Sequence, residues 1–374
     1  MIERSLKILI ESKLNTGKAI IVIGPRQTGK TTLIKEIADQ NQPYLFLDGD
    51  DPAVRELLKN PNTEQIKNII GKNTLLFLDE AQRIQNIGIT LKIITDQFKH
   101  VQLLVSGSSA IDITQSINEP LTGRKWEYIL YPICWDEWEK HIGFLPAYQG
   151  IEQRLLFGMY PEIINYQGEE KERLKQLVNS YLYKDILTYA NIKKPNILEN
   201  LLQALAFQMG NEVSLNELSG LLKIDKNTVG NYIDLLEKCF VIFRLPAFSR
   251  NLRNEIKHNK KIYFYDNGVR NMLIGNFSNL GFRTDKGALW ENFLISERKK
   301  HIEYKQLYCK SYFWRTTQQQ EIDYIEESDG AITAFEFKWS SGGNKKVPKT
   351  FKETYQNEPK IIDQSNFREF LINK

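Results

Sequence analysis

Cysteine and histidine are scarce in this sequence. The three cysteines among 374 residues, Cys134, Cys239 and Cys309, are odd in number and far apart. They can form neither a disulfide framework nor a CxxC metal pair, and this pattern favours a reducing cytoplasm. The four histidines are scattered without the spacing of metal ligands, so we expect each of them to serve surface or core packing.

Long hydrophobic runs and an excess of one charge are also missing. No apolar run approaches the roughly 18 to 20 residues that a membrane span needs. Charged residues such as Glu3, Arg4 and Lys7 interrupt the stretch where a signal peptide would be apolar. Lys and Arg number 50 against 46 Asp and Glu, a formal net charge of +4, which is too small to indicate nucleic-acid binding by itself. We therefore expect neither export nor membrane anchoring.

The first part of the chain alternates between strand and helix patterns. At 374 residues the chain is longer than one hydrophobic core usually supports, so about two to four domains are expected. Strands that alternate with helices along the chain favour a parallel sheet with helices on both faces and binding sites at the carboxyl ends of the strands. The predicted strands are Ala19–Ile23, Tyr44–Leu47, Leu75–Leu78, Gln102–Val105 and Trp126–Ile133.

After residue 140 the sequence predicts a helical region, then a winged helix, then a second α/β segment. Helical periodicity dominates residues 145–210, and Ser214 with Glu217 then forms a capping box that opens a short helix. A second helix and the strand Phe240–Leu245 complete a winged-helix pattern. A final α/β segment is predicted with a helix at Asp285–Lys299 and strands at Ile262–Tyr265, Tyr308–Trp314, Glu321–Ile325 and Ala331–Trp339.

A phosphate-binding loop follows the first strand directly. The sequence matches G-x-x-x-x-G-K-[ST] between a strand and a helix, where glycines let backbone amides face phosphates and the helix amino terminus adds positive charge. Lys30 would contact the β and γ phosphates, and the Thr31 hydroxyl would bind Mg²⁺. The sequence thus predicts ATP and Mg²⁺, bound by Gly24, Pro25, Arg26, Gln27, Thr28, Gly29, Lys30, Thr31 and Thr32.

Further candidates lie at the ends of neighbouring strands. Asp79 and Glu80 follow a buried strand, and we expect Asp79 to hold Mg²⁺ through water and Glu80 to act as general base. Ser108 lies in the segment Ser106–Ser109, where one hydroxyl could sense the γ phosphate or simply belong to a turn. Arg124 is a candidate arginine finger or inter-domain contact, with a solvated arginine as the alternative.

Four segments of the chain together resemble a known family. GPRQTGKTT, LLFLDEAQ, LLVSGSSA and LTGRKWEYILYPICWDEW resemble the AAA+ ATPases of bacteria and archaea that carry a carboxy-terminal DUF4143 domain. Similar segments up to residue 293 extend the resemblance over nearly the whole chain. It implies a P-loop ATPase core at 1–143, a helical lid at 144–210, a winged helix at 211–255 and a nuclease-like α/β domain at 256–374. Met159 replaces the second glycine of the family's Gly-Gly-(Phe/Tyr)-Pro segment, and this departure bears only on the assignment of the lid.

A second constellation lies near the carboxyl end. Glu336 and Lys338 share one face of a predicted strand, and a hairpin through Ser328–Gly330 would bring Asp323 beside Glu336. With Glu291 on the preceding helix, this set looks like a PD-(D/E)xK nuclease site, in which carboxylates hold Mg²⁺ and a lysine orients water. The usual proline before the aspartate is absent. The alternative is a retained fold that forms salt bridges, or binds DNA or protein, without cutting.

The partner is left open between DNA and protein. Residues 249–261 carry five basic side chains against one acidic one and could follow a phosphate backbone. The second winged-helix helix, however, offsets Lys226 and Lys238 with Asp234 and Glu237, which argues against major-groove reading. Two functions follow: ATP hydrolysis coupled to action on DNA, or a nucleotide-dependent switch that binds a protein. Homo-oligomerisation stays open in both.

Overall fold

The protein forms two compact units. The computed structural model describes residues 2–108, 119–180, 195–249, 260–316, 318–340 and 348–372. The first unit comprises Met1–Ile133 with Lys238–Phe240, and the second comprises Cys134–Glu237 with Val241–Lys374. The first unit ends before the predicted boundary at residue 143 because α7 (Trp135–Ile142) belongs to the second, where Trp135 packs edge-on against Phe293 and Phe367.

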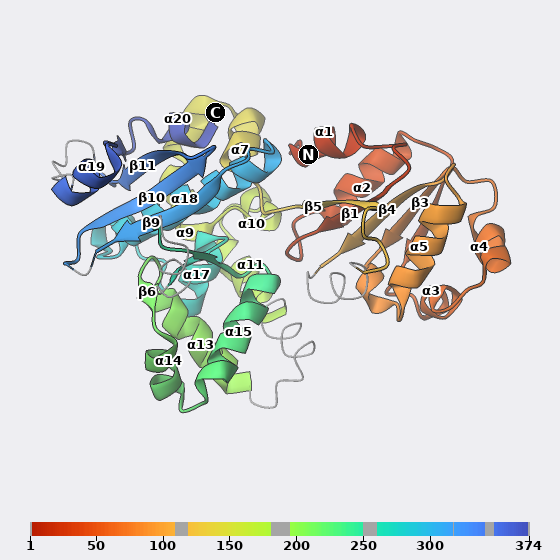
Figure 1. The fold of residues 1–374 in the computed structure, drawn as a ribbon, viewed down its shortest axis with the longest axis horizontal. Helices are drawn as coiled ribbons and strands as arrows, with labels where there is room; N and C mark the ends of the chain where they lie inside the picture. The colour runs from red at the N-terminus through yellow and green to blue at the C-terminus, as the bar shows by residue number, and fades with distance from the viewer. Residues whose placement is uncertain are drawn as a thin grey trace. The chain divides into compact units, whose positions relative to one another are not determined.

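A five-stranded parallel sheet forms the centre of the first unit (Figure 1). All residues of β1, β3 and β4 are buried, which explains their continuous apolar sequences, since both faces of such a sheet are covered. The predicted parallel sheet is therefore confirmed. Its strands, in spatial order, are β2 (Tyr44–Asp48), β3 (Leu75–Asp79), β4 (Gln102–Gly107), β1 (Ala19–Ile23) and β5 (Lys125–Ile129).

Helices belong to the same unit as this sheet, and the order of its strands determines where the predicted nucleotide-binding residues lie. Because all five strands are parallel, the ends of β1, β3 and β4 meet at one edge. Strand β5 ends at Ile129, earlier than predicted, and the amide of the next residue, Leu130, donates to the Ile23 carbonyl at 2.8 Å. The helices are α1 (Leu6–Glu11), α2 (Lys30–Asp39), α3 (Pro52–Leu58), α4 (Thr63–Ile70) and α5 (Ile87–Gln97).

The second unit opens with helices, as predicted for residues 145–210 within the described ranges. Gly158, in a left-handed conformation with φ of 78°, lets Asp266 approach closely, because a Cβ there would lie 2.0 Å from its Oδ1. The Met159 amide then donates to Asp266 Oδ2 at 2.6 Å. The helices are α8 (Phe144–Gln149), α9 (Ile151–Phe157), α10 (Pro161–Asn165), α11 (Glu170–Leu177) and α13 (Pro195–Phe207). The segment 181–186 lies outside the described residues.

A three-stranded antiparallel sheet follows, in the order β6 (Glu212–Val213), β8 (Lys260–Phe264) and β7 (Ile242–Leu245). In the chain, α14 (Leu215–Leu222) and α15 (Lys226–Lys238) lie between β6 and β7, and the Glu217 amide in the first turn of α14 donates to Ser214 Oγ at 3.4 Å. The sequence assigned β8 to the last domain, yet β8 pairs with β7 across the predicted boundary at 255. The division of the second unit into three domains remains a prediction.

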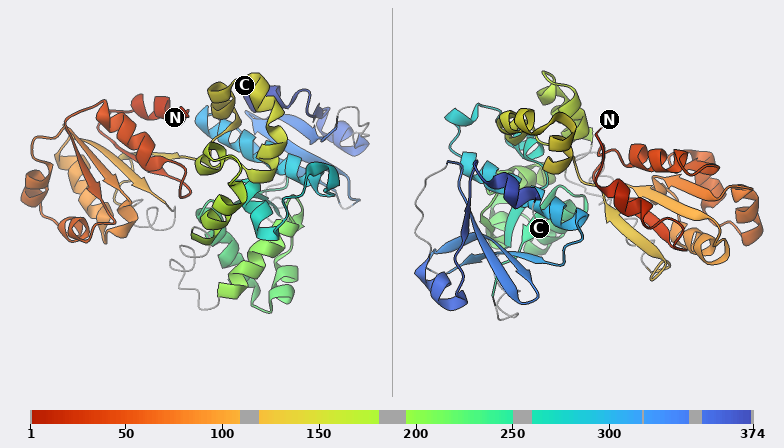
Figure 2. Two further views of the ribbon diagram at one scale, coloured as in Figure 1. Left: turned by 180° about the vertical axis from the view of Figure 1, so that it is seen from behind. Right: turned by 90° about the horizontal axis from the view of Figure 1, so that it is seen from above.

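The carboxy-terminal part contains a four-stranded sheet (Figure 2). Its hairpin turns at Asp329 and Gly330, both at positive φ, as the Ser-Asp-Gly sequence predicted. The sheet order is β12 (Lys360–Ile362), β11 (Ala331–Phe337), β10 (Glu321–Ser328) and β9 (Lys310–Arg315); the helices are α17 (Asn267–Ile274), α18 (Lys286–Tyr304), α19 (Lys349–Tyr355) and α20 (Phe367–Ile372). Strands β6 and β12 and helix α20 were not predicted. No helix in the described ranges is long and apolar enough to cross a bilayer.

Candidate nucleotide site

The loop between β1 and α2 requires glycine at two positions. A Cβ on Gly24, at φ of 149°, would lie 2.3 Å from the Leu130 carbonyl oxygen. Gly29 has φ of 90° and directly precedes α2, where a side chain would be strained. The pattern of glycines in the sequence is therefore explained by backbone contact at one end of the loop and by left-handed backbone at the other.

The Lys30 ammonium lies inside this loop. It is buried and donates to the carbonyl oxygens of Gly24 at 2.9 Å and Pro25 at 2.7 Å. Burial lowers its pKa to about 8, an effect that the carboxylates of Glu80 and Asp79 oppose. In this position the Lys30 ammonium can exchange its carbonyl acceptors for phosphate oxygens, which are stronger hydrogen-bond acceptors.

Asp79 joins three elements at the sheet edge. Thr31 Oγ1, on α2, donates to Asp79 Oδ2 at 2.7 Å, and Ser106 Oγ, on β4, donates to Asp79 Oδ1. Thr31 and Asp79 were both predicted as Mg²⁺ ligands, and the structure brings them together. A hydroxyl and a carboxylate side by side are the hard oxygen donors that Mg²⁺ prefers, so these residues fit the ion.

Glu80 directly follows β3 in a left-handed conformation with φ of 47°. A Cβ on Gly49 would lie 2.4 Å from the Glu80 carbonyl oxygen, so β2 and β3 approach closely at this point. The Glu80 carboxylate accepts hydrogen bonds from Ser108 Oγ at 3.2 Å and from Gln82 Nε2. Ser108 thus lies beside the predicted general base, whereas Ser109 lies outside the described residues.

Gln82 and Arg4 were missed by sequence reasoning. Gln82 Nε2 also donates to Ser108 Oγ at 2.9 Å, and its position two residues after Glu80 was the available signal. Arg4 is buried and bridges two segments by donating to the carbonyls of Thr28 and Tyr131, both at 2.6 Å. No sequence pattern indicates this contact, because Arg4 lies far from both acceptors along the chain.

Arg124 does not join the other candidates. It precedes β5, whose first residue pairs with Ala19 at the start of β1, so Arg124 lies at the amino edge of the sheet. The phosphate loop leaves the opposite, carboxyl edge. Arg124 Nε instead donates to Asp96 Oδ1 at 2.6 Å, and both side chains are partly exposed. The hypothesis that Arg124 serves as arginine finger in its own chain is corrected by this placement.

The carboxy-terminal candidates are only partly brought together. As predicted, the hairpin places Asp323 beside the β11 residues, and its Oδ2 accepts from the Phe337 amide at 2.8 Å. Lys338 Nζ lies 3.7 Å from Glu336 Oε2. Glu291 instead accepts from the Tyr263 hydroxyl at 2.6 Å and contacts Lys261 Nζ at 3.2 Å. Across the described ranges, no three acidic, histidine or cysteine side chains are arranged to hold a metal ion.

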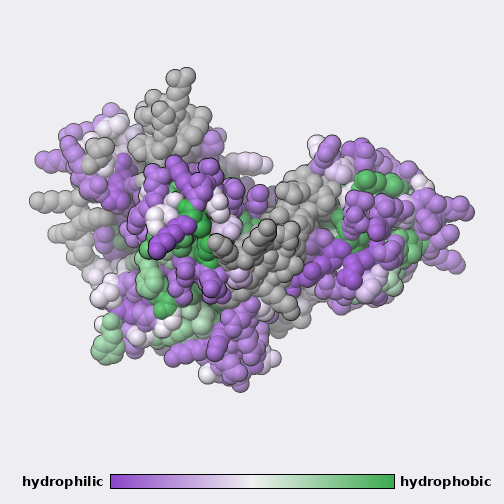
Figure 3. Space-filling view, turned by 90° about the horizontal axis from the view of Figure 1, so that it is seen from below, coloured by the Kyte–Doolittle hydropathy of each residue, from purple (hydrophilic) through white to green (hydrophobic). Residues whose placement is uncertain are grey.

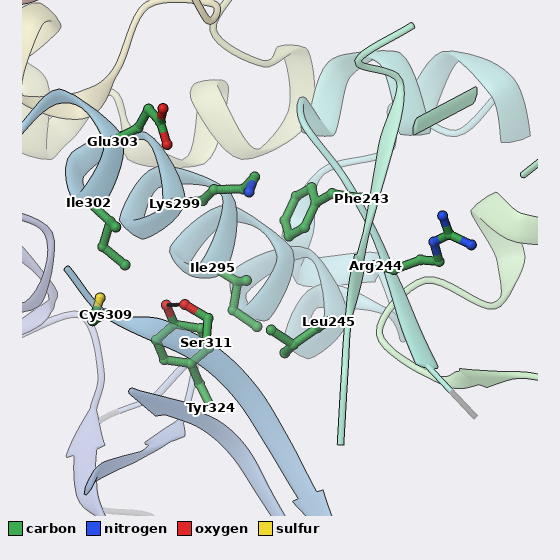
Figure 4. Close-up of a pocket in the computed structure, with 10 residues that line it drawn as sticks. All are labelled: Phe243, Arg244, Leu245, Ile295, Lys299, Ile302, Glu303, Cys309, Ser311 and Tyr324. Atoms are coloured by element: carbon green, nitrogen blue, oxygen red, sulfur yellow. Dashed lines mark hydrogen bonds between the residues drawn. The ribbon is translucent and has the colours of Figure 1, made fainter. Parts of the chain in front are cut away.

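A cavity of about 240 Å³ lies elsewhere in the second unit (Figure 4). Figure 4 shows Lys299 and Phe243 directed toward each other, and the Ser311 and Tyr324 hydroxyls are 2.7 Å apart. None of the predicted site residues lines it, so it belongs to neither constellation. Its lining is Phe243, Arg244, Leu245, Ile295, Lys299, Ile302, Glu303, Cys309, Ser311 and Tyr324.

Comparisons with known proteins agree with this geometry. An uncharacterized protein of Mycobacterium tuberculosis is 25% identical over 334 residues, which cover 88% of this chain and 72% of that protein. One of Methanocaldococcus jannaschii is 27% identical over 343 residues, covering 84% and 74%. The solved Walker-type ATPase of Pyrococcus abyssi is 15% identical with a TM-score of 0.50, covering 73% of this chain and 96% of that one, which shows similarity of fold.

Family models match three consecutive parts of the chain. The middle match, to a domain of unknown function called DUF8612, covers residues 148–280 and thus spans the predicted boundaries at 210 and 255. The other two are the families that the sequence motifs indicated. The resemblance is confirmed: the chain combines an AAA domain, matched at residues 16–139, with a DUF4143 domain, matched at residues 286–371.

Proposed function

We propose that the AAA domain hydrolyses ATP in the presence of Mg²⁺. The observation that carries this proposal is the hydrogen bond of 2.7 Å between Thr31 Oγ1 and Asp79 Oδ2, next to the buried Lys30 ammonium. Hydroxyl, carboxylate and ammonium come from two elements and meet at the carboxyl edge of the sheet. This is the combination that phosphoryl transfer from a nucleoside triphosphate requires.

The residues have separable roles in this proposal. Backbone amides of the loop and Lys30 bind the phosphates, and Glu80 accepts a proton from the water that attacks the γ phosphorus, giving ADP and phosphate. Thr31 and Asp79 would hold Mg²⁺, which neutralises phosphate charge when bound. Ser108 and Gln82 orient the Glu80 carboxylate through their hydrogen bonds and act as positioning residues.

Two substitutions test the assignment. In Lys30→Ala the phosphates lose their ammonium partner, so we expect ATP affinity to fall strongly in titration calorimetry. In Glu80→Gln the ATP affinity is retained, while phosphate release slows by roughly 100- to 10,000-fold because general-base catalysis is lost. If folded wild-type protein took up no adenine nucleotide at millimolar concentration, the proposed function would be wrong.

For the second unit we infer the helical lid, winged helix and nuclease-like domain that the sequence suggested. Helices α14 and α15, which lie between β6 and the paired strands β7 and β8, support a winged helix, and α18 followed by the β10–β11 hairpin supports a nuclease-like fold. Both inferences rest on the order and pairing of elements. We also propose a cytoplasmic location, from the sparse cysteines.

One observation favours the switch function over DNA cleavage. The ammonium of Lys261 pairs with Glu291 of the predicted nuclease site and with the nearby Glu321, where cleavage would need a metal ion. Arg244 pairs with Asp234 of α15 at 2.7 Å, and most of the basic stretch, including Arg250, Arg253 and Lys257, lies outside the described residues. Figure 3 shows a face on which hydrophilic residues predominate. We therefore propose that ATP turnover controls binding of a partner, DNA or protein, without cutting.

Incubation with plasmid separates the two functions. Wild type and Glu336→Ala are compared with Mg²⁺ or Mn²⁺, with ATP turnover measured in the same samples. We expect intact plasmid and normal ATP turnover in both. Cutting by wild type that is lost in Glu336→Ala would instead assign nuclease activity to the second unit.

A further inference from the structure

Lys261 is a buried cation in the second unit. Its side chain is 2% exposed and comes from β8, the middle strand of the three-stranded sheet. Its Nζ lies 3.2 Å from Glu291 Oε1 on α18 and forms an ion pair with Glu321 on β10. One ammonium therefore connects a strand, a helix and a strand of another sheet, and it does so out of contact with solvent.

A third carboxylate belongs to the same environment. Asp323 follows Glu321 by two residues on β10, and its carboxylate is close enough to interact electrostatically with the Lys261 ammonium. Burial alone would lower the pKa of Lys261, but the carboxylates of Glu291, Glu321 and Asp323 raise it above its usual value. Lys261 is therefore protonated at neutral pH. Burial raises the pKa of Glu291, and its pairing with Lys261 opposes that rise.

The hydrogen bonds of this cluster differ from those of a metal site. Glu291 Oε1 already accepts from Tyr263 at 2.6 Å, and Asp323 Oδ2 accepts from the Phe337 amide at 2.8 Å. An ammonium offers three donors at hydrogen-bond distance, whereas Mg²⁺ demands oxygens at about 2.0–2.1 Å in octahedral geometry. With the ammonium between them, these carboxylates therefore fit the lysine and do not fit a divalent ion, in agreement with the lack of any metal-holding group across the described ranges.

We propose that Lys261 is the resident cation of this acidic cluster and takes the charge role of a divalent metal. It follows that the cluster binds neither Mg²⁺ nor Mn²⁺ in the wild-type protein. It also follows that removing the Lys261 charge lets Glu291, Glu321 and Asp323 rearrange around a divalent cation, because partly buried carboxylates without a counter-charge gain from any cation that reaches them. This inference does not depend on ATP hydrolysis.

The test is Mn²⁺ binding to the full chain without nucleotide. All proteins carry Asp79→Asn, which removes a ligand of the ATP site, and Mn²⁺ is followed by titration calorimetry and thermal unfolding. Without further change we expect no Mn²⁺ uptake in the second unit. Lys261→Met should lower the unfolding temperature, and Mn²⁺ should then restore part of the loss. Adding Asp323→Asn to Lys261→Met should abolish that response.

Lys338→Met is the matched control, because it removes a lysine whose ion pair, with Glu336 at 3.7 Å, is partly exposed. It should gain no Mn²⁺ response. Mn²⁺ uptake by the Asp79→Asn protein that Asp323→Asn abolishes would overturn the proposal, and this measurement stands even if Lys261→Met does not fold. A folded Lys261→Met protein without any Mn²⁺ response would also overturn it.

Discussion

At the scale of single residues, the Glu80 carboxylate is oriented rather than free. Ser108 and Gln82 both donate to it, and Gln82 also donates to Ser108, so the three side chains form a closed set of hydrogen bonds. The sequence predicted Glu80 and Ser108 from their positions after neighbouring strands. It did not predict Gln82, whose only signal was its position two residues after Glu80, because a glutamine in a short 3₁₀ turn is more often solvated.

Gln82→Leu should slow ATP hydrolysis by about tenfold or more while leaving ATP affinity unchanged, since Gln82 contacts the proposed general base, Glu80, and not the phosphate loop. Phosphate release and titration calorimetry give the two quantities. Gln85→Leu is the control: the same substitution on an exposed side chain three residues later should change neither. Equal loss in both variants, or loss of affinity in Gln82→Leu, would contradict the positioning role.

The lowered pKa of Lys30 predicts a pH dependence. The folded protein releases this proton near pH 8, but the unfolded chain keeps it up to about 10.5, so the unfolding free energy should rise with pH between these values. Phosphate binding needs the ammonium, so above pH 8 ATP binding should take up a proton and weaken by up to about tenfold per pH unit. Calorimetry in buffers of different ionisation heat measures that proton. Its absence at pH 9 would contradict the placement.

At the scale of elements, the strands were predictable and their arrangement was not. Continuous apolar runs such as Leu75–Leu78 identify buried strands, and the chain order of strands and helices implies a parallel sheet. The position of β4 between β1 and β3 depends on packing over long sequence distances, as does the pairing of β8 with β7. Two- and three-residue strands such as β6 and β12 are too short to show periodicity.

Arg4 connects the segment before α1 to the phosphate loop and to the chain after β5. Arg4→Met would leave the buried carbonyls of Thr28 and Tyr131 without these donors, which costs about 1–3 kcal/mol for each unsatisfied group. Chemical denaturation should therefore show a less stable first unit, with weaker ATP binding. Arg124→Met is the control, because its solvent-screened pair with Asp96 contributes little to stability. Similar losses in both variants would count against the bridging role.

At the scale of the whole molecule, the nucleotide site and the proposed cation cluster belong to different compact units. Asp79 and Glu80 lie in the first unit, whereas Lys261 and Glu291 lie in the second. The predicted boundary at residue 143 lies beyond the end of the first unit at Ile133, because the tryptophans of α7 pack within the second unit although they follow the ATPase motifs directly. A boundary depends on which core a helix joins, and that information is not local.

Two compact units should unfold as two calorimetric transitions with different responses. In the proposed function ATP with Mg²⁺ binds the first unit alone, so at 100 times its dissociation constant it should stabilise one transition by about 2.7 kcal/mol. Asp266→Ala should lower the other, because the buried amides of Met159 and Val269 lose their acceptor, at about 1–3 kcal/mol each. Asp225→Ala, which removes an exposed acceptor of the Asn227 amide, should cost only about 0.5–2 kcal/mol. ATP could instead raise both transitions equally, including the one that Asp266→Ala lowers. The two units would then unfold together. In that case, coupling between ATP turnover and partner binding would rest on one cooperative structure instead of two.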